Sequence, residues 1–189
     1  MKTLQDIYNN YKVDADTGVG DKGTTHDYIG IYSDYINQNN CKSLLEIGVA
    51  NGHSIKMWEE YLPESKIIGV DIDISVVNFK FDKAELIEVD AASEDVLGKL
   101  GKETFDVIID DGSHKIAHQI KSLELLYPKL NTGGYYFIED IVYGDNEKKL
   151  ILFLEDNGFK YKIFKPIEKS MRYDDIIVVT YARYQNDNS

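Results

Sequence analysis

One short stretch limits the possible folds of this sequence more than any other: Leu44-Leu45-Glu46-Ile47-Gly48-Val49-Ala50-Asn51-Gly52-His53. Its first half is mostly apolar and predicts a buried strand, while Gly48 and Gly52 predict a tight turn that leads into a helix. Glycines in such a turn let the backbone approach a ligand closely at a helix N-terminus. Because the spacing is G-x-x-x-G and not the G-x-G-x-x-G of dinucleotide-binding proteins, a nicotinamide dehydrogenase is disfavoured.

From residue 43 onward the chain alternates between strand and helix patterns. We expect strands at 43–49, 66–72, 85–89, 105–110 and 134–139, and helices near 52–61, 74–80, 93–100, 115–127 and 146–157. Continuous apolar strands that alternate with helices predict an α/β fold, in which a parallel sheet is covered on both faces. The tail reads as two further strands, at 161–166 and 175–181, joined by a short polar loop.

The sequence before residue 43 predicts two amphipathic helices, at 3–12 and about 26–39, with a polar, glycine-bearing loop between them. No repeat, linker or low-complexity segment divides the chain, and 189 residues suit one domain with a sizeable core. We therefore expect a single domain at 1–189, made of an N-terminal helical lid segment (1–41) and a core (42–184).

Composition excludes several classes of function. The formal net charge of −12 argues against DNA or RNA as a substrate, because binding of a nucleic-acid backbone needs a basic surface. The single cysteine, Cys41, cannot form an internal disulfide. The N-terminus carries no apolar signal region and no apolar run approaches the length of a membrane span, so we expect a soluble, cytoplasmic protein. A homo-oligomer is compatible with the sequence.

Acidic residues follow the ends of the predicted strands, where open parallel sheets bind their ligands. The second strand ends in Asp71, which is placed to accept hydrogen bonds from a ribose. Together, the 46–52 motif and Asp71 resemble the class I S-adenosylmethionine (SAM)-dependent methyltransferases. The resemblance implies a Rossmann-like, mostly parallel seven-stranded sheet with an antiparallel last strand and helices on both faces. It also implies a SAM site lined by Glu46, Gly48, Asn51, Asp71, Asp90, Ala91 and Asp110, with Asp71 at the ribose and Asp90 and Ala91 at the adenine.

Two stretches carry the residues expected to perform the chemistry. Asp111 follows the fourth strand and Glu139-Asp140 follow the fifth, so three carboxylates should converge and repel one another. A hard divalent cation, Mg²⁺ or Mn²⁺, would relieve that repulsion. His114 lies three residues after Asp111 and suits a general base, since an imidazole titrates near neutral pH. Simpler interpretations stay open. Asp111-Gly112-Ser113 could form only a turn with a helix cap, and Glu139-Asp140 only a solvated strand end. His118 could be the relevant imidazole, both histidines could be surface residues, and Asp90 could only cap a helix.

A narrower resemblance rests on Asp110-Asp111-Gly112-Ser113-His114, on Glu139-Asp140-Ile141 and on the N-terminal Asp21-Lys22-Gly23-Thr24-Thr25-His26-Asp27-Tyr28. These segments are similar to the Mg²⁺-dependent sugar O-methyltransferases of macrolide biosynthesis, the mycinamicin and demethylmacrocin type. The resemblance implies that Asp111, Glu139 and Asp140 hold the metal and that His114 is the base. Larger members of that family carry an additional N-terminal domain, and we do not expect one in this sequence. Lys22, His26 and Tyr28 would belong to a lid, in which Lys22 could meet a carboxylate of SAM or of an acidic sugar.

We therefore expect a SAM-dependent, Mg²⁺-assisted O-methyltransferase that acts on a hydroxyl of a sugar or sugar-containing small molecule. One alternative is a metal-dependent methyltransferase of catechol-like phenols, which the 14 tyrosines neither favour nor exclude. The other is a non-catalytic SAM-binding subunit, which would not need Asp111, His114, Glu139 and Asp140 together.

Overall fold

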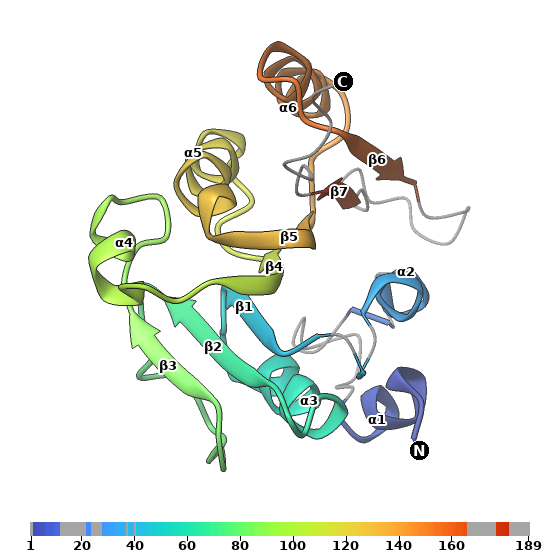
Figure 1. The fold of residues 1–189 in the computed structure, drawn as a ribbon, viewed down its shortest axis with the longest axis vertical. Coiled ribbons are helices and arrows are strands. Elements are labelled where there is room, and N and C mark those ends of the chain that lie inside the picture. The colour runs from blue at the N-terminus through green and yellow to red at the C-terminus, as the bar shows by residue number, and fades with distance from the viewer. Residues whose placement is uncertain are drawn as a thin grey trace.

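A computed structural model describes residues 2–11, 22–23, 28–36, 38–39, 41–165 and 177–181. The strands of this part of the chain are β1 (Ser43–Ile47), β2 (Lys66–Asp71), β3 (Glu85–Glu88), β4 (Phe105–Asp110), β5 (Leu130–Ile138), β6 (Tyr161–Phe164) and β7 (Ile177–Tyr181). They form one sheet in the order β3-β2-β1-β4-β5-β7-β6 (Figure 1). Strands β1 to β5 are parallel, and β7 runs antiparallel to both β5 and β6. The predicted mostly parallel sheet with an antiparallel last strand is confirmed.

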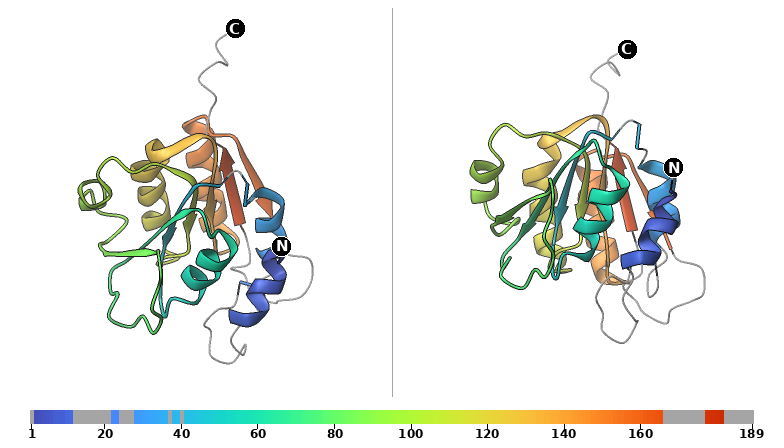
Figure 2. Two further views of the ribbon diagram at one scale, coloured as in Figure 1. Left: turned by 60° about the horizontal axis from the view of Figure 1, so that its bottom comes forward. Right: turned by 90° about the horizontal axis from the view of Figure 1, so that it is seen from below.

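Helices lie on both faces of the sheet (Figures 1 and 2). They are α1 (Leu4–Tyr11), α2 (Tyr28–Tyr35), α3 (His53–Tyr61), α4 (Asp95–Leu100), α5 (Ile116–Leu126) and α6 (Asp145–Asp156), and a short 3₁₀ turn, η1 (Tyr127–Lys129), follows α5. Helices α1 to α3 contribute to the core on one face, and α4 to α6 contribute to the core on the other. Among the described residues, none of these helices combines the length and apolar character that a membrane span requires.

The apolar strands are explained by this two-sided packing. Neighbouring side chains of a strand point to opposite faces, so Leu44 packs beneath α1 to α3 whereas Leu45 packs beneath α4 to α6. Both leucines are fully buried. Cys41, just before β1, is also buried and carries a free thiol. A strand of a one-sided sheet would instead have alternated between apolar and polar residues.

The helix predicted at 74–80 is wrong, because residues 72–84 form an irregular segment. Side chains compete there with helical hydrogen bonds, since the Asp73 carboxylate accepts a hydrogen bond from the backbone N–H of Ser75 at 2.9 Å. The backbone N–H of Asn78 donates to the carbonyl oxygen of Asn51 at 3.1 Å and not to a carbonyl of its own segment. Val77, Phe79 and Phe81 lie at the start of α3, where the Phe79 ring meets the His53 ring edge-on at 4.8 Å. The apolar spacing therefore reflects packing of an extended segment and not a helix.

Strand β5 begins four residues earlier than predicted. The sequence Asn131-Thr132-Gly133-Gly134 is typical of a turn, yet the strand continues through it with a shift of its register against β4. Gly133 adopts a φ of 80°, and a Cβ on Gly134 would lie 2.7 Å from the carbonyl oxygen of Asp106. The glycines thus allow an irregular strand to run close to its neighbour.

Candidate active site

A cavity of about 450 Å³ opens at the carboxyl ends of β1, β2 and β4. The residues around it come mainly from the loops that follow these strands, as expected for a ligand site of an open α/β sheet. The predicted site residues that line it are Lys22, Gly48, Asn51, Asp71, Asp90, Ala91, Asp110, Asp111, His114 and Asp140. Of the predicted SAM-binding residues, Glu46 alone is not part of the lining: its side chain is fully buried in β1, behind the cavity.

The glycine loop after β1 is held against the end of β4. Gly48 has a φ of 87°, and a Cβ at this position would lie 2.0 Å from the carbonyl oxygen of Asp111. Backbone hydrogen bonds join the same loops, since Gly48 donates to Val70 at 2.9 Å and Asp111 donates to Ile47 at 2.9 Å. The close approach in the structure is to the protein's own backbone, and the predicted approach to a ligand stays a prediction.

Asp71 organises the cavity rim at the end of β2. One of its carboxylate oxygens accepts hydrogen bonds from the backbone N–H groups of Val49, at 2.7 Å, and Ala50, at 3.0 Å. A carboxylate can accept about four hydrogen bonds, so capacity remains for a ligand. Asp90 accepts a hydrogen bond from the backbone of Ala92 at 2.9 Å, which closes a turn. It is not a helix cap, because α4 starts at Asp95.

Asp110 is the least satisfied acid of the cavity. Its side chain is 2% exposed, one oxygen accepts a hydrogen bond from Gly112 at 3.3 Å, and the other has no hydrogen-bond partner among the described residues. Burial raises the pKa of Asp110 to about 7, helped by the neighbouring Asp111. A buried carboxyl group that is free to donate or accept is available to a polar ligand group in the cavity.

Lys22 lies inside a group of three carboxylates. Its Nζ atom is 2.5 Å from Asp111 Oδ2, 2.7 Å from Glu139 Oε1 and 3.3 Å from Glu46 Oε1. Burial alone would lower the pKa of Lys22, but Asp111, Glu139 and Glu46 together raise it well above its usual range. The prediction that Lys22 meets a carboxylate was tied to SAM or an acidic sugar. The carboxylates it meets in the structure belong to the protein.

Helix α2 supplies two further donors, one to Asp140 and one to Glu139. The Tyr28 hydroxyl donates to Asp140 Oδ1 at 2.7 Å, and the Tyr32 hydroxyl donates to Glu139. Tyr32 is fully buried, and its ring meets the Trp58 ring edge-on at 5.3 Å. Sequence reasoning missed Tyr32, although its spacing of four residues from Tyr28 places both on one helix face. His26, the third predicted lid residue, lies outside the described residues.

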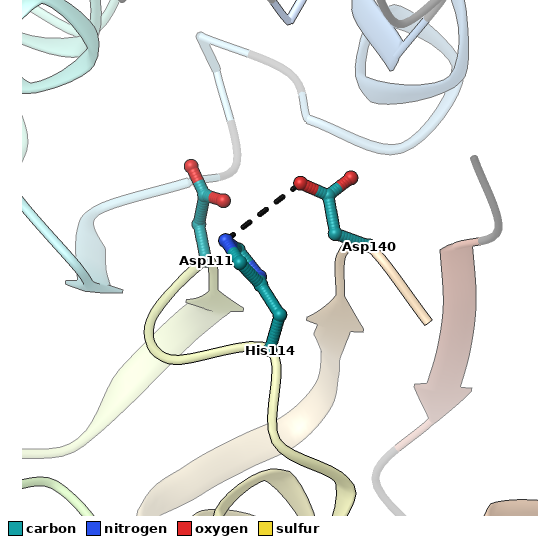
Figure 3. A group of neighbouring side chains, drawn as sticks. All are labelled: Asp111, His114 and Asp140. Carbon is teal, nitrogen blue, oxygen red and sulfur yellow. Dashed lines mark ion pairs between the residues drawn. The ribbon is translucent and has the colours of Figure 1, made fainter. Parts of the chain in front are cut away.

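Asp111, His114 and Asp140 form a group that could hold a metal ion (Figure 3). Each offers one ligand atom, and these atoms lie within 4.8 Å of one another. His114 Nε2 is 3.8 Å from Asp140 Oδ2. His114 and Asp140 both have left-handed backbones, with φ of 55° and 53°, which non-glycine residues rarely adopt. The fold thus bends the backbone at two of the three positions to aim these side chains at one point.

Glu139 and His118, which the sequence suggested for the chemistry, are not part of this group. Glu139 is buried and faces Lys22 and Tyr32, so its part in a metal site stays a prediction. Burial and the neighbouring Asp111 raise the pKa of Glu139, and Lys22 opposes them. His118, the alternative imidazole, is exposed on α5, and its Nδ1 lies 3.0 Å from the Ser113 hydroxyl. It borders the cavity but does not join Asp111 and Asp140.

The fold and the site have counterparts among known proteins. The MycE methyltransferase from the mycinamycin biosynthetic pathway, in complex with Mg and S-adenosylhomocysteine (SAH), matches the whole chain with a TM-score of 0.75 at 23% identity, over 56% of its own length. The chain therefore has the fold of the class I methyltransferases. Residues 45–141 match a family described as a methyltransferase domain, and the chain belongs to this family.

Curated relatives are similar over the same region. The L-olivosyl-oleandolide 3-O-methyltransferase of Streptomyces antibioticus is 33% identical over 130 residues, which cover 62% of this chain and 33% of the relative. The mycinamicin VI 2''-O-methyltransferase of Micromonospora griseorubida is 36% identical over 120 residues, which cover 58% of this chain and 29% of the relative. The resemblance to macrolide sugar O-methyltransferases is confirmed, and the chain spans about a third of the length of the curated relatives it matches.

Proposed function

We propose that the protein is a SAM-dependent, metal-assisted O-methyltransferase that acts on a hydroxyl group of a sugar or a sugar-bearing small molecule. The observation that carries this proposal is the convergence of Asp111, His114 and Asp140 beside a cavity that the glycine loop borders. The names of the similar enzymes specify O-methylation, in one case of an olivosyl compound, which supports a glycoside as the acceptor.

The cofactor end of the cavity has the groups that a nucleoside and an amino-acid cation require. Asp71 would accept hydrogen bonds from the ribose hydroxyls, while Asp90 and Ala91 border the region proposed for the adenine. Asp110, with its free oxygen, would offer a hydrogen bond to a polar group of the ligand. The negative charge of the surrounding acids favours the sulfonium and ammonium charges of SAM.

The residues present also fit a divalent cation. Three carboxylates surround the single ammonium group of Lys22, and burial and the neighbouring Asp111 raise the pKa values of both Glu46 and Glu139. Asp111 and Asp140 would hold the ion through carboxylate oxygens, the ligands that Mg²⁺ and Mn²⁺ prefer, with His114 beside them. A bound divalent cation supplies a Lewis acid that lowers the pKa of a hydroxyl group.

His114 would take the proton from the acceptor hydroxyl. Its imidazole is partly exposed, and since its Nδ1 is buried, Nε2 would be the nitrogen that accepts the proton. Asp140, 3.8 Å from Nε2, would stabilise the imidazolium that forms. The alternative is that His114 is itself a metal ligand. The two roles predict different consequences of removing the imidazole.

The test is calorimetric titration of MgCl₂ into protein saturated with SAH, with the wild type beside Asp111→Ala and His114→Ala. We expect saturable binding by the wild type and at least a tenfold loss of affinity in Asp111→Ala, since loss of even an outer-shell partner of a metal site costs about 10- to 100-fold. If His114 is the base, His114→Ala keeps its Mg²⁺ affinity and loses turnover of a diol-bearing glycoside. If His114 is a ligand, both are lost.

Lys115→Ala serves as the matched control, because Lys115 lines the same cavity next to His114 but is not part of the candidate metal group. This variant should bind Mg²⁺ as the wild type does. Absence of Mg²⁺ binding in the wild type, both with SAH alone and with a glycoside acceptor added, would contradict the metal-assisted mechanism. The proposal would then reduce to metal-free methyl transfer.

A further inference from the structure

Lys22 is an unusual residue to find in the interior of this protein. Its side chain is 5% exposed, and the two carboxylates nearest to its ammonium group are those of Asp111 and Glu139. Both follow strands at the carboxyl edge of the sheet, and both belong to the set predicted to bind a metal. The ammonium group therefore already neutralises carboxylates that a divalent cation would need.

The local fold delivers Lys22 to this position. The Tyr28 backbone N–H donates to the Lys22 carbonyl oxygen at 2.8 Å, which ties the lysine to the start of α2. Gly23 fits tightly beside it, since a Cβ there would lie 2.7 Å from side-chain atoms of both Ile29 and Tyr8. Lys22 thus reaches the carboxylates from outside the sheet that carries them.

The negative charges around Lys22 outnumber its single positive charge. Glu46, Asp111 and Glu139 surround a single ammonium group, so Lys22 cannot neutralise all of them. A divalent cation brings twice the charge of an ammonium group, and carboxylate oxygens are its preferred ligands. Two cations that approach the same oxygens repel each other, and each lowers the affinity of the site for the other.

Resting on the metal-assisted function proposed above, we propose that Lys22 and a divalent cation compete for Asp111 and Glu139. In the metal-free protein Lys22 is the internal counter-ion of these acids. Metal binding displaces its ammonium group and frees Glu139 to become a ligand. Lys22 thereby sets the metal affinity of the site.

The experiment is titration of MgCl₂ into SAH-saturated wild type, Lys22→Met and Lys56→Met. Methionine keeps the length and apolar stem of the lysine without its charge. Lys56→Met is the matched control, since Lys56 pairs with Glu59 at 2.7 Å on α3 and loses the same charge away from the acids. We expect Lys22→Met to bind Mg²⁺ roughly tenfold more tightly than the wild type, because one repelling cation is gone. Lys56→Met should match the wild type.

Displacement of Lys22 has its own readout. Acetylation with acetic anhydride, followed by peptide mass spectrometry, should label Lys22 slowly in the metal-free protein, because its side chain is buried. Saturating Mg²⁺ should accelerate labelling of Lys22 several-fold and leave labelling of Lys56 unchanged. If Mg²⁺ binds but Lys22 stays protected, or if Lys22→Met binds Mg²⁺ no more tightly than the wild type, the competition is excluded and Lys22 is a fixed structural counter-ion.

The outcomes separate this inference from the function on which it rests. If neither the wild type nor Lys22→Met binds Mg²⁺, the metal-assisted mechanism itself fails, and the competition fails with it. Should Lys22→Met be too unstable to purify, Lys22→Met/Glu46→Gln removes the ammonium group together with one of the three surrounding carboxylates, so that the net charge is kept. Compared with Glu46→Gln alone, the double variant should still show the roughly tenfold gain.

Discussion

Gly48 shows how one residue without a side chain holds two parts of the site together. Its backbone is left-handed, and the Asp111 carbonyl oxygen occupies the place where a Cβ would lie. We expect Gly48→Ala to lower the free energy of unfolding by about 3 kcal/mol or more, from backbone strain and overlap combined. Urea unfolding measures this, and SAH affinity should fall in parallel because the loop must shift.

Gly98→Ala is the control for that substitution. Gly98 lies within α4, and no atom comes within 4 Å of the place where its Cβ would be. Alanine is the better helix former, so Gly98→Ala should leave stability unchanged or raise it by up to about 1 kcal/mol. Equal effects of the two substitutions would contradict the role assigned to Gly48.

The buried carboxyl group of Glu46 should make the free energy of unfolding depend on pH. Burial raises its pKa from an ordinary 4.5 to about 7, with Lys22 opposing and Asp111 adding to the shift. The folded protein therefore binds this proton more tightly than the unfolded chain does. The contribution of Glu46 to stability is fully present below about pH 4.5 and is lost as pH rises through about 7.

Glu46→Gln should remove that dependence. The free energies of unfolding of the variant and the wild type should differ least near about pH 4.5. By about pH 8 the free energy of unfolding of the variant should have risen relative to that of the wild type by on the order of 3 kcal/mol. Urea unfolding at several pH values measures the difference. Glu124→Gln, on the exposed surface of α5, is the control and should show a constant difference from the wild type. A Glu46→Gln difference that does not grow with pH would exclude a raised pKa for Glu46.

At the scale of elements, the repeating strand–helix pattern predicted most of the fold. The periodicity of β1 or α3 is local, so it can be read from a short stretch of sequence. The segment at 72–84 could not be read in this way. Its apolar residues have helical spacing, but Val77, Phe79 and Phe81 pack at the start of α3 as part of an irregular segment, and that partner is distant in sequence. Tertiary packing decided its conformation.

Likewise, only part of the candidate site could be predicted from the sequence. Asp111, His114 and Asp140 could be predicted because each follows a strand end, and parallel strands bring their carboxyl ends to one edge. The contacts of Lys22 and Tyr32 with Glu139 could not, because they join α2 and the preceding segment to residues more than one hundred positions later. No local sequence pattern predicts which acid a buried ammonium group will contact.

At the scale of the whole molecule, the net charge of −12 adds a long-range field to the acids of the site. SAM carries a sulfonium charge that SAH lacks, so the field should favour SAM. Raising NaCl from about 0.05 M to about 0.5 M should weaken SAM binding about threefold more than SAH binding, because salt screens the field. Calorimetry at both salt concentrations measures the two affinities. Equal salt effects on SAM and SAH would show that the field does not distinguish them.

The position of Trp58 makes its fluorescence useful for following the site. It is the single tryptophan of the chain, and the Tyr32 ring that meets it edge-on donates its hydroxyl to Glu139. Indole fluorescence responds to nearby charge and hydrogen bonding. The protein therefore contains an intrinsic optical probe one side chain away from the acids that Lys22 neutralises. Rearrangement of those acids can be followed in real time, without a dye or an engineered label.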